Sequence, residues 1–334
     1  MLKRTMIVVL FFSLFLGAVP KEAVAAGSSW AVIDADTGRL LDGYNENVRL
    51  PIASLTKIWT AFTFIESGSS FGEVTISPQA ASAEGSSIYL QQGMTIEADA
   101  LLYGLMLRSG NDAAHALSEQ AGGSLEGFVD LMNEKALLYG LKNTVFTNPS
   151  GLHDDRHLST AYETALMLRY AMDNDKFRQI ASTKNHRYEG EDQTYSWRNK
   201  HRLIHSEPTA IAGKTGFTKA AGRTLATYFE KDGKNIIVVT LNDGNDWNTH
   251  KDLANKVFSS YKLVTVAKKG TYDILPGVEA ELEAPIRLLL KKGEKAKLQN
   301  IVRIPRGKSK RSTGSWTVSF DNEPLIASEI IIKQ

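Results

Sequence analysis

The sequence predicts an α/β fold in which an antiparallel sheet is flanked by helices and followed by a small all-β region. Strand-like apolar segments lie near residues 30–41 and again between 214 and 241, where tight-turn signals separate them. After residue 267, apolar residues recur at every second position, which is the periodicity of strands. Helical patterns occupy residues 97–108, 125–138, 161–172 and 247–262. With 334 residues, 43% of them apolar, the chain is long enough for about two domains.

The N-terminal segment has the features of a secretory signal peptide. Lys3 and Arg4 precede an apolar stretch over residues 6–19, and the small residues 23–25 offer a cleavage site. We therefore expect residues 1–26 to be removed and the protein to act outside the cytoplasmic membrane, secreted or associated with the cell envelope. An uncleaved anchor is the alternative, although the apolar stretch is shorter than the roughly 20 residues that a spanning helix needs.

The first predicted helix carries a candidate nucleophile and its base. Ser54 stands just before an apolar helical run that ends at Gly68, and Lys57 follows one turn later on the same face. A lysine of ordinary pKa is protonated at neutral pH, so Lys57 must have a lowered pKa to take a proton. Burial, the positive end of the helix dipole and a second cation such as Lys214 would each lower it. The Ser54 backbone N–H is also a candidate oxyanion donor.

Two further motifs follow in a meaningful order. Ser109-Gly110-Asn111 comes 55 residues after Ser54, and Lys214-Thr215-Gly216 comes 105 residues later. The pattern S-x-x-K alone is weak evidence, because it recurs at Ser259 and Lys262 within a predicted amphipathic helix. Ser-x-Asn and Lys-Thr-Gly each occur once, and the three motifs in this order are typical of serine acyl-transfer enzymes.

The Lys-Thr-Gly motif lies on a predicted strand with antiparallel neighbours. Gly216 would leave room for a substrate backbone at the strand edge. Lys214 and Thr215 would offer a cation and a hydroxyl to a carboxylate, which favours cleavage next to a free C-terminus.

On these motifs the chain resembles the low-molecular-mass penicillin-binding proteins that are serine-type D-alanyl-D-alanine carboxypeptidases, particularly their Bacillus-type sporulation-associated branch. The similarity extends over about residues 30–266 and includes the segments 83–90, 101–114, 148–152, 159–162 and 214–224. It implies a β-lactamase/transpeptidase-like catalytic domain over residues 27–267, built on a five-stranded antiparallel sheet. A small β-rich domain would follow over residues 268–334.

The resemblance also implies a role for each motif residue. Ser54 would form the acyl-ester and Lys57 would accept its proton. Ser109 would relay a proton to the leaving group, and Asn111 would bind the substrate backbone. Lys214 and Thr215 would hold the terminal carboxylate, while the Phe217 backbone N–H, beyond Gly216, would complete the oxyanion hole. The expected partners are peptidoglycan stem peptides ending in D-Ala-D-Ala, and β-lactam antibiotics that acylate the same serine.

The motifs leave several alternatives open. A serine β-lactamase shares the motifs, but no Glu-x-x-Leu-Asn-like element precedes Lys214. A non-catalytic wall-binding protein would not need the intact motif residues. A zinc site at His153 and His157, or at His201 and His205, is disfavoured because no H-E-x-x-H occurs, so neither a metal nor another cofactor is expected. The absence of cysteine excludes disulfides and thiol catalysis.

The C-terminal region is more basic than the rest of the chain. From residue 268 onward, 13 Lys and Arg stand against 8 Asp and Glu. A local cluster of five basic residues would allow weak peripheral association with anionic envelope surfaces, although a solvated loop is the simpler interpretation. The cluster comprises Arg303, Arg306, Lys308, Lys310 and Arg311. No nucleic acid partner is expected for a secreted chain. The amphipathic membrane-anchoring helix of many relatives is expected to be absent, because the chain ends on a strand-like segment.

Overall fold

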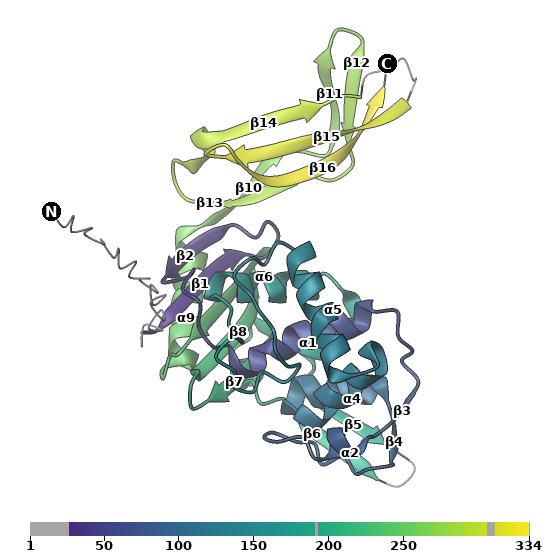
Figure 1. Ribbon diagram of the computed structural model, residues 1–334. Helices are drawn as coiled ribbons and strands as arrows, with labels where there is room; N and C mark the ends of the chain where they lie inside the picture. The colour runs from purple at the N-terminus through teal and green to yellow at the C-terminus, as the bar shows by residue number, and fades with distance from the viewer. Residues whose placement is uncertain (1–26, 191–192, 306–310, 334) are drawn as a thin grey trace, which may run out of the picture.

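A computed structural model describes residues 27–190, 193–305 and 311–333. The predicted signal segment and three of the five basic-cluster residues, Arg306, Lys308 and Lys310, lie outside these ranges. Within them, the mixed α/β architecture with a C-terminal all-β part agrees with the prediction (Figure 1).

The larger part is built on a five-stranded sheet in the order β2-β1-β9-β8-β7. Every neighbouring pair is antiparallel, as predicted. The strands are β1 (Ser29–Asp34), β2 (Leu40–Tyr44), β7 (Ala210–Thr218), β8 (Gly222–Lys231) and β9 (Lys234–Leu241). Asp232 and Gly233 both have positive φ and form the expected tight turn between β8 and β9. Since β7 ends the sheet, one of its edges is free for contacts with other groups.

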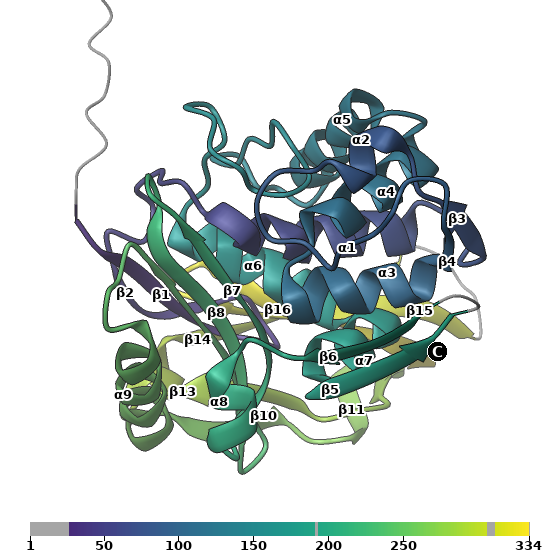
Figure 2. The same ribbon diagram turned by 90° about the horizontal axis from the view of Figure 1, so that it is seen from below.

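Alternating residues of this sheet enter two different cores. Ile237 and Val239 pack in the large cluster with the helices that include α1 and α6, whereas Ile236 and Val238 pack against α9 on the opposite face. Figure 2 shows α9 on one side of the sheet and α1 and α6 on the other. The helices are α1 (Thr56–Glu66), α2 (Pro78–Ala81), α3 (Ala98–Tyr103), α4 (Asn111–Gly122), α5 (Leu125–Leu138), α6 (Ala161–Met172), α7 (Asp175–Ser182), α8 (Arg202–Ser206) and α9 (Asp246–Ser260).

The predicted helices are mostly correct, with two differences. Residues 125–138 and 161–172 are helical over the predicted bounds, and Ser124 and Thr160 cap their N-termini by accepting hydrogen bonds from backbone N–H groups. The predicted helix 97–108 divides into α3 and a π-helical segment, η2 (Gly104–Arg108). The last predicted helix ends at Ser260, so Lys262 begins a strand and the second S-x-x-K is not a pair on one helix.

Two short hairpins complete the larger part. One joins β3 (Glu73–Thr75) to β4 (Thr95–Glu97), and the other joins β5 (Asn185–Glu189) to β6 (Thr194–Arg198). The β5–β6 hairpin was not predicted, because its exposed and buried residues alternate with few aliphatic side chains among them.

The C-terminal part consists of strands around a small separate core. Its five-stranded sheet has the order β11-β12-β16-β15-β14, and a two-stranded sheet pairs β10 with β13. The predicted alternating residues Ala280, Leu282, Val318 and Ile332 are all buried there. The strands are β10 (Lys262–Ala267), β11 (Gly270–Leu275), β12 (Val278–Leu282), β13 (Ile286–Leu290), β14 (Leu298–Arg303), β15 (Arg311–Phe320) and β16 (Glu323–Lys333), with a short 3-10 helix, η3 (Glu294–Lys297).

Polar contacts join the two parts. The Arg39 guanidinium, just before β2, donates hydrogen bonds to Glu294 and to the Leu289 carbonyl and lies 4.0 Å from the centre of the Phe320 ring. The domain boundary at residues 267/268 stays a prediction, and the pairing of β10 with β13 favours a boundary just before Lys262.

Candidate active site

Ser54 lies at the start of the first long helix, where the backbone turns sharply. A short 3-10 helix, η1 (Ala53–Leu55), leads directly into α1. Ala53 has a φ of +48°, an unfavourable conformation for a residue with a Cβ. Lys57 Nζ lies 3.1 Å from Ser54 Oγ, within the reach that one helical turn predicted.

The Lys57 amine is buried and surrounded by acceptors. It donates to Asn111 Oδ1 over 2.7 Å and to the Ser150 carbonyl over 2.5 Å. The pKa of Lys57 is lowered to about 7, chiefly by burial and also by the positive charge of Lys200, against an opposing effect of Asp112. The predicted depression of this pKa is therefore present, but Lys200 rather than Lys214 supplies the second cation.

The second motif lies where two helices meet. Ser109 has a φ of +66° between η2 and α4, and its hydroxyl accepts a hydrogen bond from Lys214 Nζ over 3.0 Å. Asn111 begins α4 and donates through Nδ2 to the Glu84 carbonyl over 2.5 Å. Both ends of the Asn111 amide are thus engaged inside the protein, and its predicted contact with a substrate backbone stays a prediction.

The third motif lies on the edge strand β7, and its residues alternate in direction. Lys214 is 2% exposed and also donates to the Thr215 carbonyl. Burial lowers its pKa well below the ordinary value, and the charges of Lys57 and Lys200 add to this effect. Thr215 and Phe217 lie on the opposite face of the strand from Lys214 and Gly216, and the Phe217 side chain is 66% exposed.

Gly216 has a structural role beyond the one predicted. A Cβ at this position would strike the Thr224 side chain and lie 2.9 Å from the Ser54 backbone nitrogen. The absence of a side chain therefore allows β7 to lie against the residue that begins the helix. Room for a substrate at the strand edge stays a prediction.

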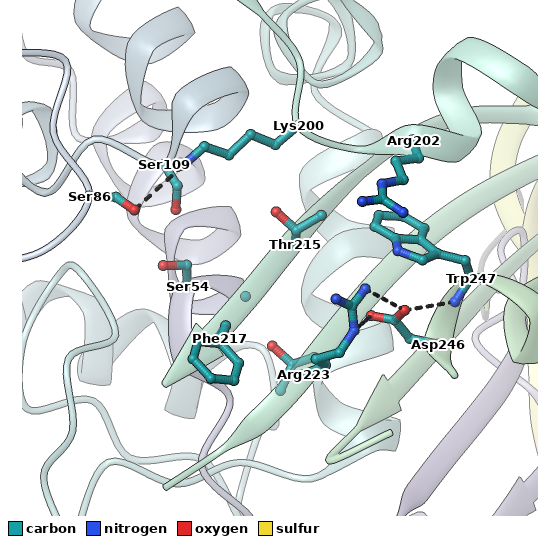
Figure 3. A pocket seen from close by; sticks show the side chains of 12 residues that line it. Ser54, Ser86, Ser109, Lys200, Arg202, Thr215, Phe217, Arg223, Asp246 and Trp247 are labelled. Carbon is teal, nitrogen blue, oxygen red and sulfur yellow. Dashed lines mark hydrogen bonds and ion pairs between the residues drawn. The ribbon is translucent and has the colours of Figure 1, made fainter. Parts of the chain in front are cut away.

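These elements border a cleft of about 550 Å³. Figure 3 shows the side chains that line it. Of the predicted site residues, Ser54, Ser109, Thr215, Gly216 and Phe217 line the cleft. Lys57, Asn111 and Lys214 are buried behind it. The remaining lining residues were not predicted: Ser86, Lys200, Arg202, Arg223, Thr224, Asp246 and Trp247.

Two of these additional residues, Arg202 and Arg223, form a cationic group around Trp247 at one end of the cleft. The Arg202 and Arg223 guanidinium groups each lie 5.7 Å from the centre of the Trp247 ring. Arg223 also makes two hydrogen bonds to Asp246, whose side chain is 3% exposed. Figure 3 shows Thr215 on the strand between this group and Ser54.

The segment 148–152 packs against η1 and the start of α1. Asn148 Oδ1 accepts hydrogen bonds from three successive backbone N–H groups, which fixes the turn that presents the Ser150 carbonyl to Lys57. Gly151 has a φ of +80° and packs so closely on Ala53 that a Cβ would collide with its carbonyl. In the sequence this segment is notable only for its similarity to the family, and its contact with Lys57 was not predicted.

Three of the four candidate zinc ligands, His157, His201 and His205, have hydrogen-bond partners within the protein. His157 is buried with its pKa lowered to about 4 by burial, and its Nδ1 accepts from the Thr147 N–H, so Nε2 donates to Thr56 Oγ1. His201 Nε2 lies 2.9 Å from Thr227 Oγ1, and His205 Nε2 lies 3.0 Å from the Asn199 carbonyl. Across the described ranges, no group of three or more His, Cys, Asp or Glu side chains is arranged to hold a metal ion.

Comparison with known proteins identifies the family. The sequence profile of D-alanyl-D-alanine carboxypeptidases matches residues 17–245. The chain belongs to the D-alanyl-D-alanine carboxypeptidase family. It is a serine-type peptidase and a penicillin-binding protein by family, and neither a β-lactamase nor a non-catalytic wall protein is favoured.

Individual relatives of this carboxypeptidase span most of its length. D-alanyl-D-alanine carboxypeptidase DacF of Bacillus subtilis is 31% identical, over 95% of this chain and 88% of the relative. A D-alanyl-D-alanine carboxypeptidase from Mycobacterium tuberculosis is 30% identical with a TM-score of 0.66, over 69% of this chain and 90% of that structure. Penicillin-binding protein 5 from Haemophilus influenzae has the same two-part fold, with a TM-score of 0.75 at 22% identity over 95% and 99% of the two chains.

In the part of the carboxypeptidase that the structure describes, no helix is both long enough and apolar enough to cross a membrane.

Proposed function

We propose that Ser54 attacks the carbonyl carbon of the penultimate D-alanine in stem pentapeptides that end in D-Ala-D-Ala. The Ser54 Oγ–C bond forms, the peptide C–N bond breaks, and D-alanine leaves as a free amino acid. Water then hydrolyses the acyl-ester and regenerates the serine. The observation that carries this proposal is the geometry around the Lys57 amine.

A neutral amine has two N–H groups and one lone pair. The two shortest contacts of Lys57 Nζ are to Asn111 Oδ1 and the Ser150 carbonyl, both of which only accept hydrogen bonds. With both N–H groups occupied in this way, the lone pair is left for the Ser54 hydroxyl 3.1 Å away, which then donates. Because the pKa of Lys57 is about 7, a large share of the amine is neutral at neutral pH. The amine can therefore accept the serine proton as the oxygen attacks.

The oxyanion of the tetrahedral intermediate would be held by the backbone N–H groups of Ser54 and Phe217. The close approach of Gly216 to the Ser54 nitrogen supports this assignment, because it brings the two N–H groups to the same end of the cleft. Such preorganised donors are typically worth about 3 kcal/mol each to the transition state.

Protonation of the departing amine is assigned to Ser109. Its hydroxyl lines the cleft and accepts a hydrogen bond from Lys214. With Lys214 donating to its oxygen, the Ser109 proton is free to point toward the leaving nitrogen. Lys214 then replaces that proton from behind the cleft wall. When water hydrolyses the acyl-ester, the water proton passes through Ser109 back to Lys214, and Lys57 returns its proton to Ser54 Oγ, so every group regains its starting state.

The free carboxylate of the substrate is assigned to Thr215 together with Arg202 and Arg223. Lys214 is buried, so its contribution to carboxylate binding is through its charge and its hold on the strand rather than by direct exposure. The two guanidinium groups line the cleft beside Thr215, and Asp246 orients one of them. A free C-terminus is thus matched by a hydroxyl and two cations.

We also propose an extracytoplasmic location. The charged, apolar and small-residue segments of residues 1–26 support export, and the expected substrate lies in the cell wall. A role in sporulation is supported only by resemblance to one branch of the family. Weak association with anionic envelope surfaces is supported by the basic residues after 302.

Replacing the nucleophile tests the proposal. Ser54→Ala should release no D-alanine from a defined stem pentapeptide and form no covalent penicillin adduct by intact-mass spectrometry. The matched control is Ser259→Ala, which removes the exposed serine of the second S-x-x-K and should behave as wild type. A penicillin adduct that maps to a residue other than Ser54 would refute the assignment, and a wild-type adduct that hydrolyses in under a second would indicate a β-lactamase.

A further inference from the structure

Lys200 is a cation in the cleft that the proposed mechanism does not use directly. It stands between β6 and α8, and its Nζ extends to Ser86 Oγ at 3.5 Å, close to Ser109 (Figure 3). Its ammonium lines the same cleft as Ser54 and Thr215. A substrate bound at Ser54 therefore passes near this charge.

The backbone at Lys200 is held in place. Its N–H donates to the Leu107 carbonyl, and the preceding Asn199 donates to the Lys184 and Thr183 carbonyls through its backbone and side chain. Asn199 Oδ1 also accepts from the next N–H, that of His201. The backbone position from which the exposed ammonium extends is thus fixed, as a binding group requires.

Within the part of the chain that the structure describes, the charge of Lys200 has no acidic counterpart. Among the described residues, no carboxylate lies within ion-pair distance of its Nζ. Its pKa is lowered by burial and by the nearby charge of Arg108, and its own charge acts on Lys57 and Lys214. The Lys200 side chain is exposed to the cleft, and a cation among like charges would be stabilised by a bound anion.

The substrate's free C-terminus does not account for this cation. The proposed carboxylate position at Thr215 has Arg202 and Arg223, and the single acid lining the cleft, Asp246, is already paired with Arg223. The cleft therefore offers a second cationic position, near Ser86 and Ser109, after the terminal carboxylate has been bound.

We infer that Lys200 binds a second carboxylate of the substrate, so that the enzyme prefers stem peptides with an acidic third residue of the diaminopimelate type over those with lysine. This inference rests on the proposed function and specifies its substrate class. Diaminopimelate and lysine have the same aliphatic chain and differ by one carboxylate next to the terminal amine. They are therefore a matched pair of probes for a cation at this position.

The test compares two acetylated peptides, X-D-Ala-D-Ala with X either diaminopimelate or lysine, by release of D-alanine. We expect wild-type kcat/KM to be about tenfold higher for the diaminopimelate peptide, as expected for one partly screened charge pair. Lys200→Gln should reduce that ratio to near one by slowing the diaminopimelate peptide more than the lysine peptide, since loss of the charge near Lys57 affects both peptides equally. Lys200→Glu should invert the ratio. Lys200→Arg should retain the preference, and Lys262→Gln, on the exposed start of β10, should leave both peptides unchanged.

Other outcomes would overturn the inference in distinguishable ways. Equal loss on both peptides in Lys200→Gln would mean that Lys200 holds the shared terminal carboxylate or acts only through Lys57. A wild-type ratio near one, or a ratio that Lys200→Gln leaves unchanged, would exclude a second anion site at this residue. Penicillin labelling of Ser54, measured in parallel, separates these results from failure of the proposed function, in which labelling itself would be absent.

Discussion

At the scale of single residues, the central feature is an amine that the protein keeps from being fully protonated. Burial lowers the pKa of Lys57 to about 7, and its two acceptors are a side-chain amide and a backbone carbonyl, neither of which carries a charge. A carboxylate in either place would stabilise the ammonium and raise the pKa. The neutrality of the Lys57 partners is therefore as important as their geometry.

Asn111→Asp tests this point, because it replaces a neutral acceptor of Lys57 by a charged one of the same shape. The pKa of Lys57 should rise by at least about one unit, since an opposite charge in contact favours the protonated amine. The rate of Ser54 acylation by penicillin at pH 7 should fall at least about tenfold and recover toward higher pH. An unchanged pH profile would contradict this explanation. Asn255→Asp, on the exposed face of α9, is the matched control.

The sequence allowed the Ser54–Lys57 contact to be predicted because it depends on positions one helical turn apart. It did not allow Lys200 or the Ser150 carbonyl to be predicted. Ser150 contacts Lys57 across 93 positions of the chain, and Lys200 is an ordinary lysine outside every motif. Such long-range contacts depend on how the loops pack, and local periodicity does not report that packing.

At the scale of elements, the site depends on the close approach of β7 to the start of α1. Gly216 packs so close to η1 that a Cβ on it would lie 2.9 Å from the Ser54 backbone nitrogen. The Thr224 hydroxyl on β8 donates to the Ile52 carbonyl over 3.0 Å. Two neighbouring strands thus fix the turn that precedes the helix. The strands could be predicted from their apolar composition. The contact between Gly216 and η1 could not be predicted, because a glycine in a strand is compatible with several structural roles.

Gly216→Ala should separate these elements. The added methyl group must displace Thr224 or Ser54, so we expect Ser54 acylation to slow at least about tenfold while circular dichroism shows the fold retained. Gly244→Ala is the control, because a Cβ there has nothing within 4 Å. Wild-type acylation in Gly216→Ala would show that the glycine is not needed for the geometry of the site.

At the scale of the whole molecule, the C-terminal part is joined to the catalytic sheet on the side of β2 and not at the cleft. Arg39 and Glu294 make the shortest polar contact between the two parts, with side chains only 11% and 17% exposed. The alternation of apolar residues after residue 267 allowed the C-terminal strands to be predicted. The contact of this part with the region of β2 could not be predicted. The contact depends on the assembled shapes of two separate cores.

A double-mutant cycle on Arg39→Ala and Glu294→Ala measures this contact. The two hydrogen bonds of the pair should give a coupling energy of about 1 kcal/mol in chemical unfolding. The exposed pair Lys297 and Asp321, each 56% exposed, should give a coupling near zero under the same conditions. Penicillin acylation of Ser54 should not change in any of these variants. Loss of acylation in Arg39→Ala would instead mean that the C-terminal part shapes the cleft.

The pH dependence of Ser54 acylation tests the central claim most directly. The second-order rate constant for penicillin labelling of Ser54 would be measured by intact-mass spectrometry from pH 5 to pH 9. If neutral Lys57 is the base, the rate should fall about tenfold per pH unit well below pH 7 and level off above it, because protonation at a pKa of about 7 removes the lone pair. A rate that stays constant from pH 5 to pH 9, or one that Lys57→Met leaves unchanged, would contradict the claim.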